Sequence, residues 1–349
     1  MKRKCKNLRF FIAFLPILSK LFDSYFQLGR VNMKIIKTIL ATTVLGVTYS
    51  AQANIVASVK PLGFIASSIA DGVTDTQIIV PAGASPHDYN LKPSDVQKVK
   101  SADIVLWIGK DVDVFLEKSI HQTETKNVIE LAKLEKVKAL LGKSEHHHDD
   151  HDHDHDHDHD HDHDHDHGHH HEVDENGLTI NWHIWYSPEI SKVIANQVAE
   201  KLTEKFPSQK AKIAENLANF DRTLAAQNDK IKSQLAAYKD KGFYVFHDAY
   251  GYFNDAYGLK QTGAFTINPL VAPGAKTLAH IKEEIAEHKV TCLFAEPQFT
   301  PKVIETLSKG ADVNVGRLDP MGDAISLGPN SYANFLQFTA DSYAQCLRK

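Results

Sequence analysis

Cysteine is scarce in this sequence and an excess of basic charge is missing, and each shortage excludes a class of protein. Three of the 349 residues are cysteine, too few and too widely spaced for a zinc site built on cysteine pairs. The formal net charge is −5 at pH 7 with histidine neutral, whereas nucleic-acid binding needs a basic face. No His-Glu-x-x-His pattern, the helical zinc site of many metalloproteases, occurs either. We therefore expect no nucleic-acid partner.

The distribution of acidic and basic residues favours binding of cations. Residues 1–53 hold nine Lys or Arg and one Asp, so 30 basic and 43 acidic residues remain in the rest of the chain. Ten of those acids are Asp residues in the segment 146–171, which leaves the body outside this segment near −3. The length allows two domains with cores of their own, and the hydrophobic fraction of 42% is ordinary for a soluble protein.

The N-terminal part has the pattern of an export signal. Residues 33–53 combine a charged start, a short apolar core and an Ala-Gln-Ala cleavage site, as a secretory signal peptide does. The apolar core is too short for permanent membrane insertion, and no cysteine at the cleavage point offers a lipid anchor. We expect a soluble periplasmic protein that begins at Asn54. Residues 1–32 are an extra leader or a mis-assigned start, with translation beginning at Met33.

Two cysteines remain after the leader is removed. Cys292 and Cys346 form an even pair in an oxidising compartment, which favours a disulfide over the alternative of two buried free thiols. The bond would close a loop of about 55 residues, worth roughly 4 kcal/mol in the chain-entropy model.

Strands and helices alternate along most of the chain. Apolar runs predict strands at residues 55–59, 77–80, 103–108, 243–246, 290–295 and 313–318. Helical spacing predicts helices at residues 64–73, 93–100, 188–198, 278–288 and 332–347. This order is typical of α/β proteins with parallel sheets that helices cover on both faces.

One long helix is predicted to organise the rest. Residues 208–238 contain apolar side chains spaced by three, four or seven and no internal Gly or Pro. About thirty residues would make a rigid rod of roughly 45 Å. We expect it, as segment 207–241, to join an N-terminal α/β lobe (54–206) to a C-terminal one (242–349). Such a rod predicts a cleft between the lobes with little freedom to open.

A run of histidine and aspartate interrupts the first lobe. Such a segment cannot bury a core, so residues 145–172 should be a disordered loop. Its imidazoles could form several weak metal sites: His146, His147, His148, His151, His153, His155, His157, His159, His161, His163, His165, His167, His169, His170 and His171. The loop could collect zinc, gate its transfer or sense its concentration, or it could be a tolerated low-complexity insertion.

Six histidines lie outside the run: His87, His121, His183, His247, His280 and His288. Three of these, at 121, 280 and 288, sit in polar stretches and are expected to be solvated. The other three follow predicted strands or precede a capped helix, and ligands gather where parallel strands end. Glu296 and Asp319 also follow strands.

Three imidazoles and one carboxylate would make a tetrahedral site that suits zinc. A carboxylate in place of one imidazole would favour manganese instead. The alternative is that each histidine is merely hydrogen-bonded at the end of its strand.

Five ordered motifs resemble those of one protein family. They are Gly83–Tyr89 with Pro93–Asp95, Trp182–Trp185 with Ser187–Pro188, Phe246–Phe253, Glu296–Phe299 and Leu318–Pro320. Together they are similar to the ZnuA-type, metal-specific solute-binding proteins of bacterial zinc ABC uptake systems. The resemblance covers residues 54–349, and the His/Asp run lies where this family has a charged loop.

The resemblance implies two βα lobes joined by a long helix, with metal ligands at His87, His183 and His247. Some relatives have Glu directly before the first histidine, but Pro86 stands there in this chain. Either Asp319 or a water is then left as the fourth ligand, and we expect Asp319.

The resemblance also implies roles for residues behind the ligands. Glu296 is expected to orient loops or a ligand histidine from the second shell of the site, and Asp248 to support the main chain around His247. Cys292 and Cys346 match the positions of a disulfide in similar proteins.

The implied function is capture of Zn²⁺ in the cleft and delivery to an inner-membrane ABC permease by a monomer that catalyses no reaction. The alternatives are a manganese or iron carrier of the same family, a zinc-dependent hydrolase and a surface adhesin. A hydrolase would need an open coordination position and a general base, for which Asp248 or Glu296 could be imagined.

The His/Asp run should bind less metal in acid. Its imidazoles protonate near their ordinary pKa of about 6.5, and protonated imidazole does not bind metal. We expect the number of weakly bound zinc ions to fall between about pH 7 and 5.5, as measured by calorimetry. An equal weak-site stoichiometry at the two pH values would contradict this.

Overall fold

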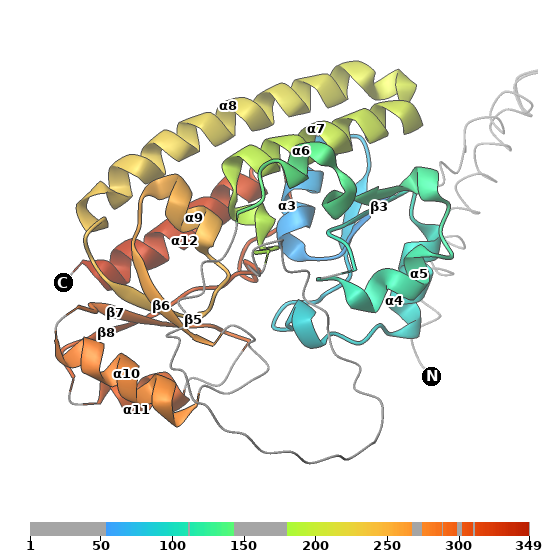
Figure 1. Cartoon of the computed structure of the whole chain (residues 1–349). Coiled ribbons are helices and arrows are strands. Elements are labelled where there is room, and N and C mark those ends of the chain that lie inside the picture. The colour runs from blue at the N-terminus through green and yellow to red at the C-terminus, as the bar shows by residue number, and fades with distance from the viewer. Residues whose placement is uncertain are drawn as a thin grey trace, which may run out of the picture. The chain divides into compact units, whose positions relative to one another are not determined.

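Two four-stranded parallel sheets form the framework of the part of the chain that the computed structural model describes (Figure 1). Their orders are β2-β1-β3-β4 and β6-β5-β7-β8. The strands are β1 (Asn54–Ala57), β2 (Asp75–Ile78), β3 (Ile104–Trp107), β4 (Val128–Glu130), β5 (Phe243–His247), β6 (Gln261–Thr266), β7 (Cys292–Ala295) and β8 (Asn314–Arg317). The helices are α3 (Lys60–Ile69), α4 (Pro93–Ser101), α5 (Glu117–Ile120), α6 (Glu135–Lys138), α7 (Pro188–Lys205), α8 (Lys210–Leu235), α9 (Gly251–Tyr257), α10 (Ala275–Ala286), α11 (Lys302–Ser308) and α12 (Ser331–Leu347). The predicted α/β class with two parallel sheets is confirmed.

The structure describes residues 54–110, 112–142, 180–266, 274–287, 289–298, 302–309 and 311–348. The predicted leader (1–53) and the predicted His/Asp loop (145–172) lie outside these residues, so both stay predictions. Among the helices of the described ranges, none has the length and apolar character needed to cross a membrane.

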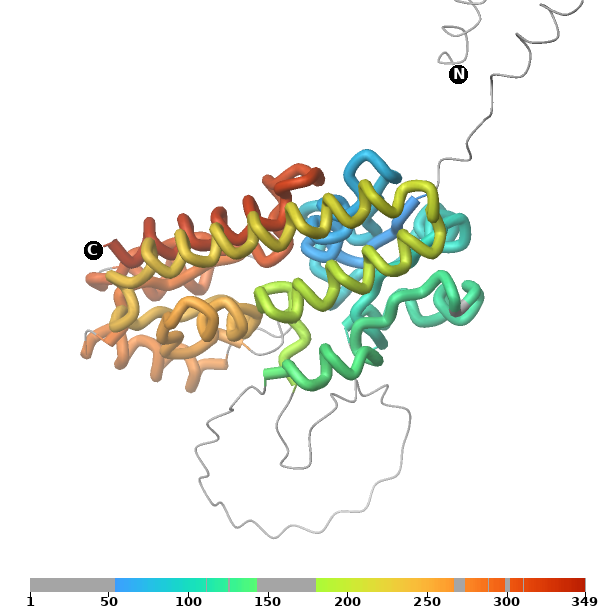
Figure 2. The backbone as a smooth tube through the Cα atoms, turned by 90° about the horizontal axis from the view of Figure 1, so that it is seen from above, coloured from blue at the N-terminus to red at the C-terminus, as the bar shows by residue number. Residues whose placement is uncertain are grey.

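Helix α8 carries the predicted apolar stripe. A 3-10 turn at Pro207–Gln209 leads into it, and Ile213, Phe220, Leu224 and Ile231 are buried. Its 26 residues correspond to about 39 Å. Figure 2 shows α8 lying along α12 over one half and along α7 over the other, in agreement with their contacts.

One hydrophobic core joins the two sheets. The same cluster contains Ile55 and Leu106 from the first sheet and Phe243 and Phe294 from the second, together with the inner faces of α3, α7, α8 and α12. Smaller clusters lie on the opposite faces of the two sheets. A shared, close-packed core limits how far the sheets can move apart.

The predicted boundaries 54–206, 207–241 and 242–349 stay a prediction. The strands divide between the two outer segments as expected. Helix α12 of the last segment nevertheless packs against α3 of the first, and residues 53–349 form one compact unit.

The disulfide is present in the second lobe. Cys292 in β7 is bonded to Cys346 in α12, with 5.9 Å between their Cα atoms. The predicted pairing is confirmed, and it fastens α12 to the sheet that carries His247.

Asn216 ties α8 to the end of α3, and replacing it should destabilise the protein. Its Nδ2 donates hydrogen bonds to the carbonyls of Ile69 (2.9 Å) and Asp71 (2.8 Å). Asn216→Ala would leave the buried carbonyl of Ile69 and the part-buried carbonyl of Asp71 without this donor. We therefore expect the free energy of unfolding to fall by about 1–3 kcal/mol in chemical denaturation. Asn219→Ala, on the exposed side of the same helix, is the matched control and should change it by less than about 0.5 kcal/mol. Equal effects of the two substitutions would contradict this role.

Candidate metal centre

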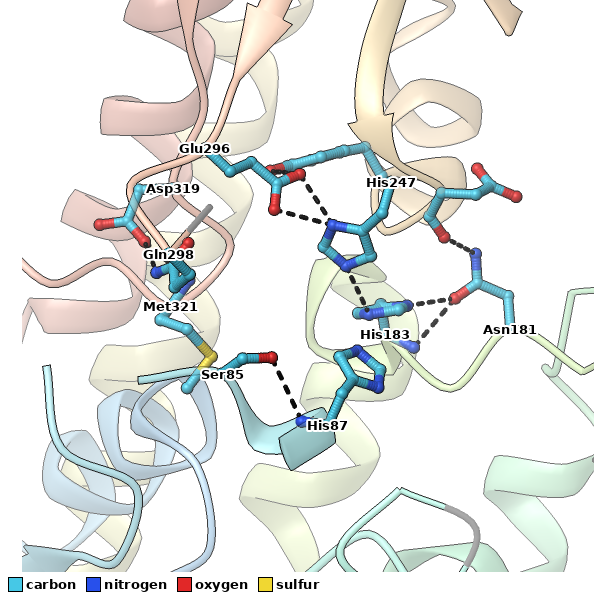
Figure 3. A network of polar contacts seen from close by, with 11 residues as sticks. Ser85, His87, Asn181, His183, His247, Glu296, Gln298, Asp319 and Met321 are labelled. Atoms are coloured by element: carbon cyan, nitrogen blue, oxygen red, sulfur yellow. Dashed lines mark hydrogen bonds and ion pairs between the residues drawn. The ribbon is translucent and has the colours of Figure 1, made fainter. Parts of the chain in front are cut away.

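Three histidines from separate parts of the fold meet at one point (Figure 3). His247 is the last residue of β5, His87 lies in a 3-10 turn at Pro86–Asp88, and His183 precedes the 3-10 turn Ile184–Tyr186 that leads into α7. One ring nitrogen of each lies within 4.8 Å of the others. The sequence motifs therefore place these imidazoles together, as a metal site requires.

Asn181 fixes the orientation of His183. Its Oδ1 accepts the main-chain N–H of His183 at 3.0 Å, and its Nδ2 donates to the carbonyl of Asp248 at 3.3 Å. Because a main-chain N–H only donates and a carbonyl only accepts, these two bonds settle which end of the amide is oxygen. The same Oδ1 lies 2.9 Å from Nδ1 of His183. Nδ1 must therefore carry the proton, and Nε2 presents a lone pair.

Glu296 fixes the orientation of the His247 ring. Its two carboxylate oxygens lie 2.8 and 2.7 Å from Nδ1 of His247, and Tyr250 donates its hydroxyl to one of them at 3.1 Å. Both His247 and Glu296 are almost fully buried. The carboxylate accepts a hydrogen bond from Nδ1, so in the neutral ring Nε2 of His247 also presents a lone pair. Glu296 therefore lies behind His247, and its role of orienting a metal ligand stays a prediction.

The two Nε2 atoms lie at a separation that suits a bound cation. Nε2 of His247 lies 3.3 Å from Nε2 of His183, and when both rings are neutral with Nδ1 protonated, neither Nε2 can donate to the other. Two nitrogens bound to one tetrahedral zinc at 2.0–2.1 Å lie about 3.3–3.4 Å apart. In that neutral form the two acceptor nitrogens lie at the spacing that zinc would bridge.

Burial keeps His183 uncharged. Desolvation is the largest cause that lowers the pKa of His183 well below its ordinary value, and the neighbouring His247 and His87 lower it further. A metal ligand must be deprotonated, so this environment favours the binding form of the imidazole.

The turn that carries His87 is fastened to the other lobe. Ser85 Oγ accepts the main-chain N–H of His87 at 3.3 Å and so begins the turn. Upstream, the N–H of Gly83 donates to Asp323 Oδ2 at 2.7 Å, and Lys60 Nζ donates to the carbonyl of Asp323 at 2.7 Å. Gly83 has φ +77°, a left-handed conformation that glycine adopts without strain. The Gly83–Asp323 bond holds the His87 loop against the second lobe, and the Lys60–Asp323 bond holds α3 against the same residue.

Asp319 lies outside the three-histidine group. Its Oδ1 accepts from Gln298 Nε2 (3.1 Å) and from the main-chain N–H of Met321 (3.0 Å), and its Oδ2 accepts from the N–H of Asp323 (2.7 Å). Figure 3 shows this cluster beside the site, away from Asn181. The role of Asp319 as the fourth ligand stays a prediction, and coordination would compete with these bonds.

The remaining candidates occupy different surroundings. Asp248 accepts a hydrogen bond from Gln261 at 3.0 Å through its carboxylate, and its carbonyl holds Asn181. It therefore supports His183 through Asn181. His121 and His280 are exposed, as expected, while His288 and the run 146–171 lie outside the described residues.

Comparison with known proteins identifies the family. The model of the periplasmic component A of the zinc-uptake complex, ZnuA, matches residues 55–346. The high-affinity zinc uptake system protein ZnuA of Haemophilus influenzae is 67% identical over 328 residues, covering 89% of this chain and 97% of that protein. The protein of the same name from Haemophilus ducreyi is 57% identical over 312 residues, covering 89% and 98%. The chain belongs to the ZnuA family.

A crystal structure of ZnuA has the same fold. It superposes with a TM-score of 0.66 at 22% sequence identity, covering 84% of this chain and 99% of that one. The arrangement of two parallel sheets and bracing helices is thus the fold of ZnuA structures as well.

Asn181 is the residue of this ZnuA-family site that sequence analysis missed. Its position two residues before His183 is the one signal that could have drawn attention to it. Because it fixes the ring of His183, Asn181→Ala should weaken zinc binding by about 10- to 100-fold, the usual effect of losing the partner behind a ligand. Competition with a chromophoric chelator measures this.

Asn90→Ala is the matched control for that substitution. Asn90 is exposed and follows His87 by three residues, so its loss should leave zinc affinity unchanged. Equal zinc affinity in Asn181→Ala and the unmodified protein would show that the amide does not orient the ligand.

Proposed function

We propose that this protein binds Zn²⁺ between its lobes and carries it through the periplasm to an inner-membrane ABC permease. The observation that carries the proposal is the convergence of His87, His183 and His247, with the Nε2 lone pairs of two of them aimed at one point. The family to which the chain belongs is that of a periplasmic zinc-uptake component. A site of three imidazoles favours zinc over the manganese or iron of an alternative carrier.

The site suits capture of an ion rather than catalysis. A zinc hydrolase needs a general base beside an open coordination position. Glu296 accepts from His247 and Tyr250, so its carboxylate holds a site histidine. The Asp248 carboxylate accepts a hydrogen bond from Gln261 instead. We therefore propose that the protein catalyses no reaction.

The protein acts as a soluble monomer in this proposal. Residues 33–53 direct export, and the mature chain begins at Asn54. In the described ranges the exposed large apolar side chains are Val114, Leu140 and Val315, and scattered single residues of this kind do not make an oligomer interface. The His/Asp run at residues 145–172 would bind further zinc ions weakly.

Metal analysis of the chain without residues 145–172 tests the zinc site. We expect one tightly bound zinc per chain, and none in His183→Ala or His247→Ala, because each substitution removes one of the converging nitrogens. His121→Ala removes an exposed imidazole and should keep the zinc. Retention of tight zinc by both site variants would contradict the proposal.

A growth experiment distinguishes a role in zinc transport from a role as a surface adhesin or a zinc buffer. Cells that lack this protein should fail to grow in chelated medium, and added zinc should rescue them. Normal growth of such cells would argue against a role in uptake.

A further inference from the structure

One hydroxyl of the second lobe joins two segments of the first lobe beside the metal site. Tyr252, the second residue of α9, is buried. Its hydroxyl accepts the main-chain N–H of Gly142 at 2.9 Å and donates to the main-chain carbonyl of Asn181 at 2.8 Å. Because a main-chain N–H only donates and a carbonyl only accepts, the direction of both bonds is settled. Gly142 and Asn181 flank the segment 143–180, so Tyr252 closes the base of that segment.

The packing around this hydroxyl is close. A Cβ added to Gly142 would lie 3.3 Å from the ring of Tyr252, and one added to Gly251 would lie 3.3 Å from Nδ2 of Asn181. The two glycines therefore let segments of the first lobe approach the start of α9. Burial raises the pKa of Tyr252 to about 12, so at neutral pH its hydroxyl keeps the proton that it donates to Asn181.

Asn181 connects this anchor to a candidate metal ligand. Its carbonyl is held by Tyr252, its Nδ2 donates to the carbonyl of Asp248 at 3.3 Å, and its Oδ1 accepts the main-chain N–H of His183 at 3.0 Å. The same Oδ1 lies 2.9 Å from Nδ1 of His183, and Figure 3 shows the amide beside that ring. Tyr252 and Asp248 belong to the second lobe, whereas His183 belongs to the first. The orientation of His183 is thus set by residues of the other lobe.

We propose that Tyr252 is a positioning residue of the zinc site, which holds Asn181, and through it the ring of His183, in the orientation that binds metal. This inference rests on the proposed function, since it concerns the same ion. It gives the hydroxyl a role in metal binding that the packing of its aromatic ring does not supply. It also links the site to the base of segment 143–180, because Gly142 shares the hydroxyl.

The test compares the mature full-length protein with Tyr252→Phe, which removes the hydroxyl and keeps the ring. Tyr257→Phe is the matched control, because Tyr257 is also buried on α9 and donates its hydroxyl to Asn228 of α8 at 2.7 Å. Chelator competition measures zinc affinity at the tight site, and chemical denaturation of the zinc-free proteins measures stability. Tyr252→Phe is also made in the Asn181→Ala variant, which keeps the carbonyl of residue 181 but lacks the amide.

We expect Tyr252→Phe to weaken zinc binding by about three- to tenfold, the effect of losing one or two neutral hydrogen bonds. Tyr257→Phe should lower stability to a similar degree and leave zinc affinity unchanged. In the Asn181→Ala background, Tyr252→Phe should change zinc affinity by less than about twofold, because the amide through which the hydroxyl acts is gone.

Three outcomes overturn the inference. Unchanged zinc affinity in Tyr252→Phe would leave the hydroxyl a structural role alone. Equal losses of affinity in Tyr252→Phe and Tyr257→Phe would mean that any loosening of α9 weakens the site. An undiminished effect of Tyr252→Phe in the Asn181→Ala background would mean that the hydroxyl does not act through Asn181. Each of these results leaves one tight zinc in the unmodified protein, whereas failure of the proposed function would leave none.

Discussion

The site depends on the hydrogen bonds that Asn181 and Glu296 accept from the Nδ1 atoms of two histidines. Each bond decides which ring nitrogen carries the proton and so which one is left to bind metal. Without these partners the imidazoles could rotate or donate to each other, and the close approach of the two Nε2 atoms would be an ordinary hydrogen bond. With them, two neutral rings present both Nε2 lone pairs toward one point, where a cation can bind.

The fold holds these partners in place through a core shared by both lobes. His183 and Asn181 come from the first lobe, and His247 and Glu296 from two neighbouring strands of the second. Helices α3, α8 and α12 pack together beneath them, and Tyr332 on α12 donates its hydroxyl to the carbonyl of Trp185 at 2.8 Å. Contacts of this kind couple the distance between the ligands to the packing of the whole protein. A brace of this kind explains how residues from both lobes are held together at one site.

Helices, strands and site residues that follow from a local sequence pattern could be predicted. Those that depend on tertiary contacts could not. The apolar stripe of α8 and the histidines at strand ends were recognisable because each follows from spacing along the chain. Strand β6 was missed because of its composition. Gly263 interrupts it, and the ring of Tyr244 lies where a side chain would be, 2.6 Å from an added Cβ. Strand β2 was predicted at 77–80 and is found at Asp75–Ile78, although the N–H groups of Ile79 and Val80 still donate to the carbonyls of Ala57 and Ser58. Asn181 acts through its side-chain amide, which no periodicity in the sequence marks.

The most direct measurement is anomalous diffraction at the zinc absorption edge from crystals of the zinc-loaded protein. We expect a strong peak in the cleft, about 2.0–2.1 Å from a ring nitrogen of each of His87, His183 and His247. A cleft without anomalous signal, or an ion bound to fewer than three of these imidazoles, would contradict it.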